Sequence, residues 1–231
     1  RNGNIDINNP HNFRTRSSIL ISSNNINILI DTSPDLRLQL YDAKCTNIDA
    51  VLFTHEHTDH VAGLPDMRAI SLINKKIIPA YLPIEMKNKI ISYYKYIFEG
   101  DKEYLPFMKP IDLTSEFCIN EIKIETFKHN HGSIDVQTYK IGKFAYSTDI
   151  KYFYDKDLDK LKNLDLWIVG LLRDEPHPSH AGFDQIMEYV NYIKPKKTVF
   201  THMTALLDEK KLSSKIPKNI IVGYDGFEIN I

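Results

Sequence analysis

The chain has 231 residues, of which 42% are hydrophobic, and its formal net charge is −1. This length and hydrophobic content are ample for a substantial core, so we expect residues 1–231 to form a single domain. The near-zero charge gives no overall field that would steer the chain to nucleic acid or to an anionic membrane, and no apolar run approaches the roughly 20 residues that span a bilayer.

The first part of the chain predicts strands and helices in alternation. The predicted strands are 17–21, 26–30, 49–53 and 77–81, and the predicted helices are 35–41, 65–73 and 84–98. In the last of these helices Met86, Ile90 and Ile97 recur at helical spacing. That stripe favours packing in the core or a dimer contact over a role as a substrate lid.

From Phe117 onward the pattern becomes rich in strands. The predicted strands are 117–119, 122–127, 136–141, 144–147, 166–171 and 197–201, and the predicted helices are 157–161 and 183–192. The order of sheet followed by helices therefore occurs twice. No linker rich in Gly, Ser or Pro separates the two halves, which indicates one mixed α/β layered domain.

Two cysteines, Cys45 and Cys118, are far apart, and neither lies in a CxxC pattern or beside a histidine. This arrangement favours buried thiols in a reducing compartment, and hence a cytoplasmic location. The chain begins at Arg1 rather than at Met. Whether an upstream segment, such as a targeting signal, precedes Arg1 is therefore left open.

The most informative segment directly follows the predicted strand 49–53. It contains four candidate metal ligands within six residues, namely His55, His57, Asp59 and His60. Imidazole nitrogens and carboxylate oxygens bind zinc, manganese and iron. The ligands are too many for one ion with an open position, so we expect two ions, with His55 and His57 on one and Asp59 and His60 on the other.

Three later residues complete the set of candidate ligands. His131, Asp149 and His202 each stand where a predicted strand ends, so their side chains are expected to share a cleft. Taken singly, each has a plainer interpretation. His131 or its neighbour His129 could lie on the surface, Asp149 could cap a helix, and His202 could be a half-buried structural histidine.

Together, the HxHxDH box and these later residues resemble the metallo-β-lactamase superfamily over nearly the whole chain. The resemblance implies a four-layered αββα sandwich with a dinuclear site at one edge. It implies the following ligands: His55, His57 and His131 on one metal, Asp59, His60 and His202 on the other, and Asp149 bridging. His131 is preferred to His129 because the motif's histidine directly precedes glycine.

Three short segments, Asp31–Asp35, Thr201–Met203 and Tyr224–Gly226, resemble the branch that includes the phosphonate-pathway cyclic phosphodiesterase and is close to the coenzyme PQQ synthesis B proteins. The resemblance implies that Asp31 fixes a ligand histidine through its other ring nitrogen, whereas a helix cap is the alternative. Asp225 before Gly226 could likewise be a turn residue, which is the commoner use of Asp-Gly.

The N-terminal region departs from this branch. Relatives carry a first strand containing Gly and Cys that this chain lacks before residues 2–4. Arg14 and Arg16 match a basic pair in similar bacterial proteins. They could reach a phosphate, although a solvated surface pair is the commoner use of such arginines.

A further histidine, His180, lies in the segment Pro176–His180 after the strand that ends at Leu171. We expect it to be a catalytic helper, because a histidine at such a position in related phosphodiesterases contacts the phosphate or protonates the leaving oxygen. The alternative is that His177 and His180 only shape a Pro-rich turn. Asp59 and His180 are thus the predicted catalytic residues, with Asp59 also serving as a ligand.

These observations predict a dinuclear metal-dependent hydrolase, foremost a phosphodiesterase for a small cyclic phosphate or a nucleotide-like phosphodiester. Two cations lower the pKa of a bridging water, which makes hydroxide available as the nucleophile. The expected cofactors are two divalent ions, zinc first, with manganese or iron as alternatives. The expected partner is a small-molecule phosphodiester, and no binding to a membrane is expected. Whether the protein forms a homodimer is left open.

Other functions share this centre. A tRNA 3′-end nuclease is not favoured, because no basic Gly/Pro-rich insertion is present to grip tRNA, although a nucleic-acid substrate stays open. A thioesterase and a non-catalytic cofactor carrier, like the PQQ-linked relatives, are the remaining alternatives. A lactamase would usually be secreted. Oxygen-reducing diiron relatives carry Glu where this chain has His57, so redox chemistry is not expected.

Overall fold

The computed structural model describes residues 5–231, so residues 2–4 noted above lie outside the described part. The chain forms two compact units. The first comprises Arg16–Thr114, and the second combines residues 5–15 with Ser115–Ile231. Each unit has its own sheet and its own hydrophobic core. The expectation of a single domain over residues 1–231 stays a prediction.

The sheet of the first unit has five strands in the order β1-β2-β3-β4-β5. They are β1 (Ile19–Ser23), β2 (Ile26–Ile30), β3 (Ala50–Leu52), β4 (Ile78–Leu82) and β5 (Met108–Asp112). The hairpin β1–β2 is antiparallel, and the other pairs are parallel. The sequence did not predict β5, which contains Pro110 and lies at the edge of the sheet, where a missing N–H is tolerated.

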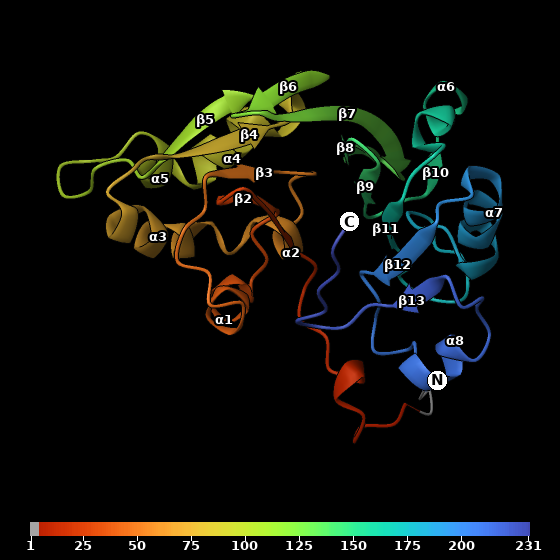
Figure 1. Ribbon diagram of the computed structural model, residues 1–231. Coiled ribbons are helices and arrows are strands. Elements are labelled where there is room, and N and C mark those ends of the chain that lie inside the picture. The colour runs from red at the N-terminus through yellow and green to blue at the C-terminus, as the bar shows by residue number, and fades with distance from the viewer. Residues whose placement is uncertain (1–4) are drawn as a thin grey trace. The chain divides into compact units, whose positions relative to one another are not determined.

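The helices of the first unit pack their apolar residues onto this sheet. They are α1 (Leu36–Asp42), α2 (Thr58–Val61), η2 (Leu64–Asp66), α3 (Met67–Asn74), α4 (Ile84–Tyr93) and α5 (Lys95–Phe98). In Figure 1, α1 and α3 lie on the same side of the sheet. The predicted helix 84–98 is broken at Tyr94, whose backbone leaves the helical region (φ −118°, ψ 39°). Met86, Ile90 and Ile97 are buried in the core, as the packing interpretation predicted.

The sheet of the second unit has eight strands. Seven follow the order β10-β7-β8-β9-β11-β12-β13, and β6 pairs with β7. They are β6 (Glu116–Ile119), β7 (Ile122–His131), β8 (Ile134–Ile141), β9 (Phe144–Ser147), β10 (Tyr152–Phe153), β11 (Leu166–Gly170), β12 (Lys197–Thr201) and β13 (Ile220–Val222). The strands β9, β11, β12 and β13 are mutually parallel. Parallel strands bring the segments that follow them to one edge of the sheet.

The helical elements of this unit are η1 (Pro10–Asn12), α6 (Asp155–Leu158), η3 (Asp159–Leu161), α7 (Phe183–Ile193) and α8 (Glu209–Ser213). Figure 1 shows α7 beside the strands β11 and β12. Its buried residues Ile186, Val190 and Ile193 recur at helical spacing and join the core around Trp167. The short elements β10, β13 and α8 were not predicted, because two to five residues carry too little periodicity.

The prediction of two buried thiols is wrong for Cys118. This residue is exposed, and Cys45 is partly buried. The reason is that β6 pairs only with β7, and its alternate residues face away from the core. Among residues 5–231, the structure contains no helix with the length and apolar character needed to cross a membrane.

Candidate metal centre

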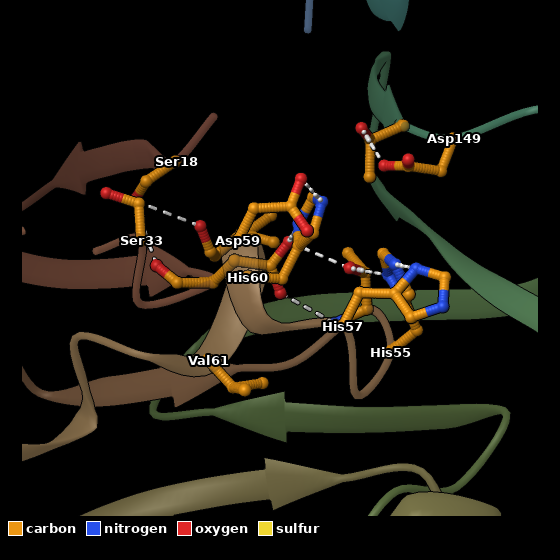
Figure 2. A network of polar contacts seen from close by, with 12 residues as sticks. Ser18, Ser33, His55, His57, Asp59, His60, Val61 and Asp149 are labelled. Atoms are coloured by element: carbon orange, nitrogen blue, oxygen red, sulfur yellow. Dashed lines mark hydrogen bonds and ion pairs between the residues drawn. The ribbon is translucent and has the colours of Figure 1, made fainter. Parts of the chain in front are cut away.

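The predicted HxHxDH residues gather where β3 ends in the first unit. His55 and His60 are fully or almost fully buried, and His57 immediately precedes α2. Figure 2 shows the side chains of His55, His57, Asp59 and His60 grouped around this short helix. The turn is tightened by a hydrogen bond from the His60 N–H to the His57 carbonyl oxygen at 2.9 Å.

The donor atoms of these four residues approach one another closely. Nε2 of His55 lies 3.0 Å from Nδ1 of His57, and Nε2 of His60 lies 3.6 Å from Oδ2 of Asp59. The rings of His55 and His60 are 4.3 Å apart between centroids. These distances bring together, within the first unit, all four ligands that the sequence predicted there.

Asp31 directly follows β2 and holds one of these histidines. Its Oδ2 accepts a hydrogen bond from Nδ1 of His60 at 2.7 Å, and its Oδ1 accepts one from the Thr54 N–H at 2.8 Å. It does not cap the following helix, whose N-cap residue is Asp35. Because Nδ1 of His60 donates to Asp31, Nε2 carries the lone pair that a metal needs.

Thr54, which the sequence analysis did not single out, orients a second histidine. Its hydroxyl lies 2.8 Å from Oδ2 of Asp31 and 3.0 Å from Nδ1 of His55. Since the carboxylate can only accept, the hydroxyl donates to Asp31 and accepts from His55. Nε2 of His55 is therefore also left as a lone-pair donor. The position directly before the first histidine of the box was the available signal for this role.

The second unit gathers the other predicted residues around one carboxylate oxygen. Asp149 Oδ1 lies 3.8 Å from Nε2 of His131, 3.7 Å from Nε2 of His180 and 3.4 Å from Nε2 of His202. The donor atoms of His131, Asp149 and His180 fall within 4.8 Å of one another. Within this unit the structure thus brings together the three predicted ligands and the predicted helper.

Three site residues that follow strands share an unusual backbone conformation. Asp31, Asp149 and His202 have φ values of 63°, 54° and 58°. The left-handed region is sparsely populated by residues other than Gly, and Asp and His are among those that enter it more readily. Backbone of this kind concentrates at functional sites, because the surrounding structure must offset its cost.

The loop that carries His180 also fixes His131. The Ser179 carbonyl oxygen lies 2.8 Å from Nδ1 of His131, so that nitrogen donates and Nε2 holds the lone pair. His177 and His180 form an isolated β-bridge, and Nδ1 of His177 contacts the Ser179 hydroxyl at 2.9 Å. His177 thus shapes the turn, whereas His180 faces Asp149.

The environment of His180 disfavours a charged ring. Burial lowers the pKa of His180 to about 4, and the neighbouring His131, His202 and His177 act in the same direction, against the opposing effect of Asp149. The imidazole is therefore neutral near pH 7 in the metal-free protein.

His129 was the alternative to His131 as a metal ligand, but both of its ring nitrogens are hydrogen-bonded within the second unit. Its Nδ1 contacts the Thr138 hydroxyl at 2.9 Å, and its Nε2 contacts the Thr148 carbonyl oxygen at 2.7 Å. The side chain is fully buried, and burial lowers its pKa to about 4. With both nitrogens engaged, His129 has no atom to offer a metal.

The two arginines singled out in the sequence differ in their surroundings. The Arg14 guanidinium donates to the Leu207 carbonyl oxygen at 2.8 Å, and burial lowers its pKa. The Arg14 side chain is therefore partly buried and held by backbone carbonyl oxygens of the segment after β12, in contrast to a fully solvated surface arginine. Arg16 is exposed, as the surface interpretation expected, and its backbone N–H donates to Asp35. Asp225 accepts from the Thr15 N–H.

The donor set fits divalent cations. His55, His60 and His131 each have Nδ1 directed to an oxygen acceptor, which leaves Nε2 free of a proton. Asp59 and Asp149 add carboxylate oxygens. Nitrogen and oxygen donors of this kind suit zinc, manganese and iron alike.

The comparisons with known proteins agree with this fold. The family model described as "Beta-lactamase superfamily domain" matches residues 26–203. An octanoyltransferase of Porphyromonas gingivalis is 33% identical over 225 residues, covering 94% of this chain and 45% of that protein. The chain thus spans only about half the length of this relative.

Two solved structures are similar over most of this chain. A diphosphatase from the PhnP family has 28% sequence identity and a TM-score of 0.89, covering 95% of this chain and 85% of that chain. Zinc-bound PqqB from Methylobacterium extorquens has 17% identity and a TM-score of 0.74, covering 94% and 88%. The predicted resemblance to this branch and the predicted mixed α/β fold with two sheets are confirmed. The chain therefore belongs to the beta-lactamase superfamily.

Proposed function

We propose that the protein is a dinuclear metal-dependent phosphodiesterase that acts on a small cyclic phosphate or a nucleotide-like phosphodiester. The single observation that carries this proposal is the oriented donor set: histidines whose Nδ1 atoms are tied to oxygens, so that each presents Nε2. The similarity to a PhnP-family diphosphatase supports a phosphate ester as the substrate.

In this proposal the metal ligands follow the division that the superfamily membership suggests. The ligands are divided as follows: His55, His57 and His131 on one ion, Asp59, His60 and His202 on the other, and Asp149 shared by both. Zinc is the first choice of metal, with manganese or iron as alternatives. When bound, the two ions would supply hydroxide as the nucleophile and offset the charge on the phosphate oxygens.

The remaining step belongs to His180. Burial keeps its ring neutral near pH 7. The neutral ring would offer an Nε2–H as a hydrogen-bond donor to the departing alcohol oxygen and so offset the negative charge that grows there. That nitrogen lies 3.7 Å from Asp149 Oδ1, so the ring faces the cluster.

The test is hydrolysis of bis(p-nitrophenyl) phosphate by the protein reconstituted separately with zinc and with manganese. We expect turnover with at least one metal, loss of turnover in Asp149→Asn, and a fall of about 10²–10⁴-fold in kcat for His180→Ala at unchanged metal content. His177→Ala, altered on the same turn, is the matched control and should stay close to the parent. Unchanged activity in Asp149→Asn and His180→Ala would refute the assigned roles.

A second candidate, acyl-thioester hydrolysis, is favoured by the relative named an octanoyltransferase. In phosphodiester and in thioester hydrolysis alike, a nucleophile attacks an electrophilic phosphorus or carbon atom, and negative charge develops on the oxygen atoms bonded to it. The probe is the octanoyl thioester of N-acetylcysteamine, with the released thiol as the readout. Release by the parent but not by Asp149→Asn would support this candidate, and no release with either metal would exclude it.

A further inference from the structure

A continuous chain of hydrogen bonds crosses the interior of the second unit. The contacts are Trp167 Nε1 to Ser147 Oγ (3.1 Å), Ser147 Oγ to Thr138 Oγ1 (3.0 Å), Thr138 Oγ1 to His129 Nδ1 (2.9 Å) and His129 Nε2 to the Thr148 carbonyl oxygen (2.7 Å). All five residues have 0% exposure. Four polar side chains are thus buried without a formal charge, which is costly unless each finds a partner.

In this chain of hydrogen bonds, the donor and acceptor roles of the two His129 nitrogens are fixed. The Thr148 carbonyl oxygen can only accept, so Nε2 of His129 carries the proton. In a neutral ring Nδ1 is then an acceptor, and the Thr138 hydroxyl must donate to it. The Thr138 oxygen keeps the Ser147 hydroxyl as its other partner. His129 is therefore held in one tautomer and one orientation by a partner at each nitrogen.

The chain of hydrogen bonds ends at the carbonyl oxygen of Thr148, in the peptide that precedes Asp149. Thr148 and Asp149 are also tied by the Thr148 hydroxyl, which donates to Asp149 Oδ2 at 2.6 Å. On another side Gly170 approaches so closely that a Cβ there would lie 3.1 Å from Asp149 N and 3.2 Å from Thr148 Cα. Asp149 itself has a φ of 54°, a conformation that its surroundings must hold in place.

We propose that His129 is a positioning residue for the Asp149 carboxylate. By donating from Nε2 to the Thr148 carbonyl oxygen, it fixes the peptide from which Asp149 projects. The carboxylate then keeps Oδ1 toward His131 and His202 while Oδ2 is held by Thr148. The proposal rests on the proposed function only in taking Asp149 as a metal ligand.

The experiment measures zinc affinity in the absence of substrate, by competition with a chromophoric chelator, on the full chain at a temperature where circular dichroism shows each apoprotein folded. The decisive variant is Thr138→Val, which removes one hydroxyl of the chain at nearly constant volume. Thr198→Val is the matched control, because Thr198 is also fully buried in this sheet and its hydroxyl has no hydrogen-bond partner in the described structure.

We expect Thr138→Val and His129→Leu to bind zinc about 10- to 100-fold more weakly, as is typical when a group that orients a ligand is lost. His129→Gln should recover most of the affinity, since an amide offers both a donor and an acceptor. Thr198→Val should bind zinc as the parent does.

Two results would overturn the proposal. One is that Thr138→Val binds zinc as tightly as Thr198→Val does, even if its apoprotein has a lower melting temperature. That result would mean that the hydrogen bonds stabilise the fold without positioning Asp149. The other is a His129→Gln variant that binds zinc no better than His129→Leu. A parent protein that binds zinc but cleaves no phosphodiester would contradict the proposed function and leave this test intact.

Discussion

Oδ2 of Asp31 and Nδ1 of His60 form a hydrogen bond of 2.7 Å between two side chains that are both fully buried. The pair joins the residue after β2 to the short helix after β3. It fixes both the tautomer and the direction of the His60 ring, so that Nε2 faces Asp59. The same carboxylate also receives the N–H and the hydroxyl of Thr54.

We expect Asp31→Asn to weaken metal binding by about 10- to 100-fold. An amide oxygen can replace only part of a carboxylate that accepts from Thr54 N, Thr54 Oγ1 and His60 Nδ1, and its NH2 group would face a donor. Asn also tolerates the positive φ of this position, so the backbone should be retained. Zinc titration of the parent and the variant measures the change, and equal affinities would contradict it.

Thr54→Val should weaken metal binding while Thr54→Ser retains it. Valine fills the same volume but removes the hydroxyl that accepts from Nδ1 of His55, and it leaves Oδ2 of Asp31 with one donor, Nδ1 of His60, in place of two. The loss of a buried partner should also lower the free energy of unfolding by about 1–3 kcal/mol. Zinc affinity and urea denaturation are the two measurements. A serine variant as impaired as the valine variant would show that the methyl group, not the hydroxyl, matters.

Gly63→Ala should destabilise the turn that follows the histidine box. A Cβ at Gly63 would collide with the Ser33 carbonyl oxygen and lie 2.8 Å from Leu36 Cβ. Overpacking of this kind costs about 1–3 kcal/mol. The control is Gly142→Ala, where nothing lies within 4 Å and only the positive φ opposes the change, at about 1–2 kcal/mol. Thermal unfolding should rank Gly63→Ala as the more damaging substitution, and the reverse order would refute the steric argument.

Asp208→Asn should loosen the N-terminal segment of the second unit. Asp208 caps α8 through the Lys211 N–H, and its Oδ2 accepts from the Asp6 N–H and from Nδ2 of Asn12. An amide cannot accept at both oxygen positions, so we expect the free energy of unfolding to fall by about 1–3 kcal/mol at pH 7. Denaturant titration measures it, with Asp174→Asn as the control, since that carboxylate only faces Lys215 at 4.0 Å.

The effect of Asp208 should depend on pH with a definite sign. The hydrogen bonds from Asp6 and Lys211 N–H groups lower its pKa to about 2 in the folded protein, below the value of about 4 that is usual in an unfolded chain. A depressed folded pKa adds stability above the unfolded pKa, and this is lost as the pH falls from about 4 to about 2. The gap between the parent and Asp208→Asn should therefore be full above about pH 5 and shrink toward pH 2. A gap that stays constant over this range would contradict the role of the charge.

The sequence by itself determined the elements with strong periodicity and the chemistry of the site. The apolar runs of β2, β3 and β12 and the spacing of α7 mark buried strands and an amphipathic helix, because burial imposes the periods of two and 3.6 residues. The box from His55 to His60 places several ligands in one turn, so local spacing alone reveals it. The resemblance to the superfamily also came from these residues.

Only the tertiary structure decided which polar groups meet. Asp31 and His60 are 29 residues apart, and Thr148 is 19 residues from His129, so neither pairing has a local signature. The sequence offered His129 and His131 as alternatives. Hydrogen bonds engage both nitrogens of His129, whereas Nδ1 of His131 donates to Ser179 and its Nε2 lies 3.8 Å from Asp149 Oδ1. Arg14 likewise reaches carbonyl oxygens about 190 residues away. Such contacts follow from strand order and burial, because a buried polar group must find a partner wherever the fold brings one close.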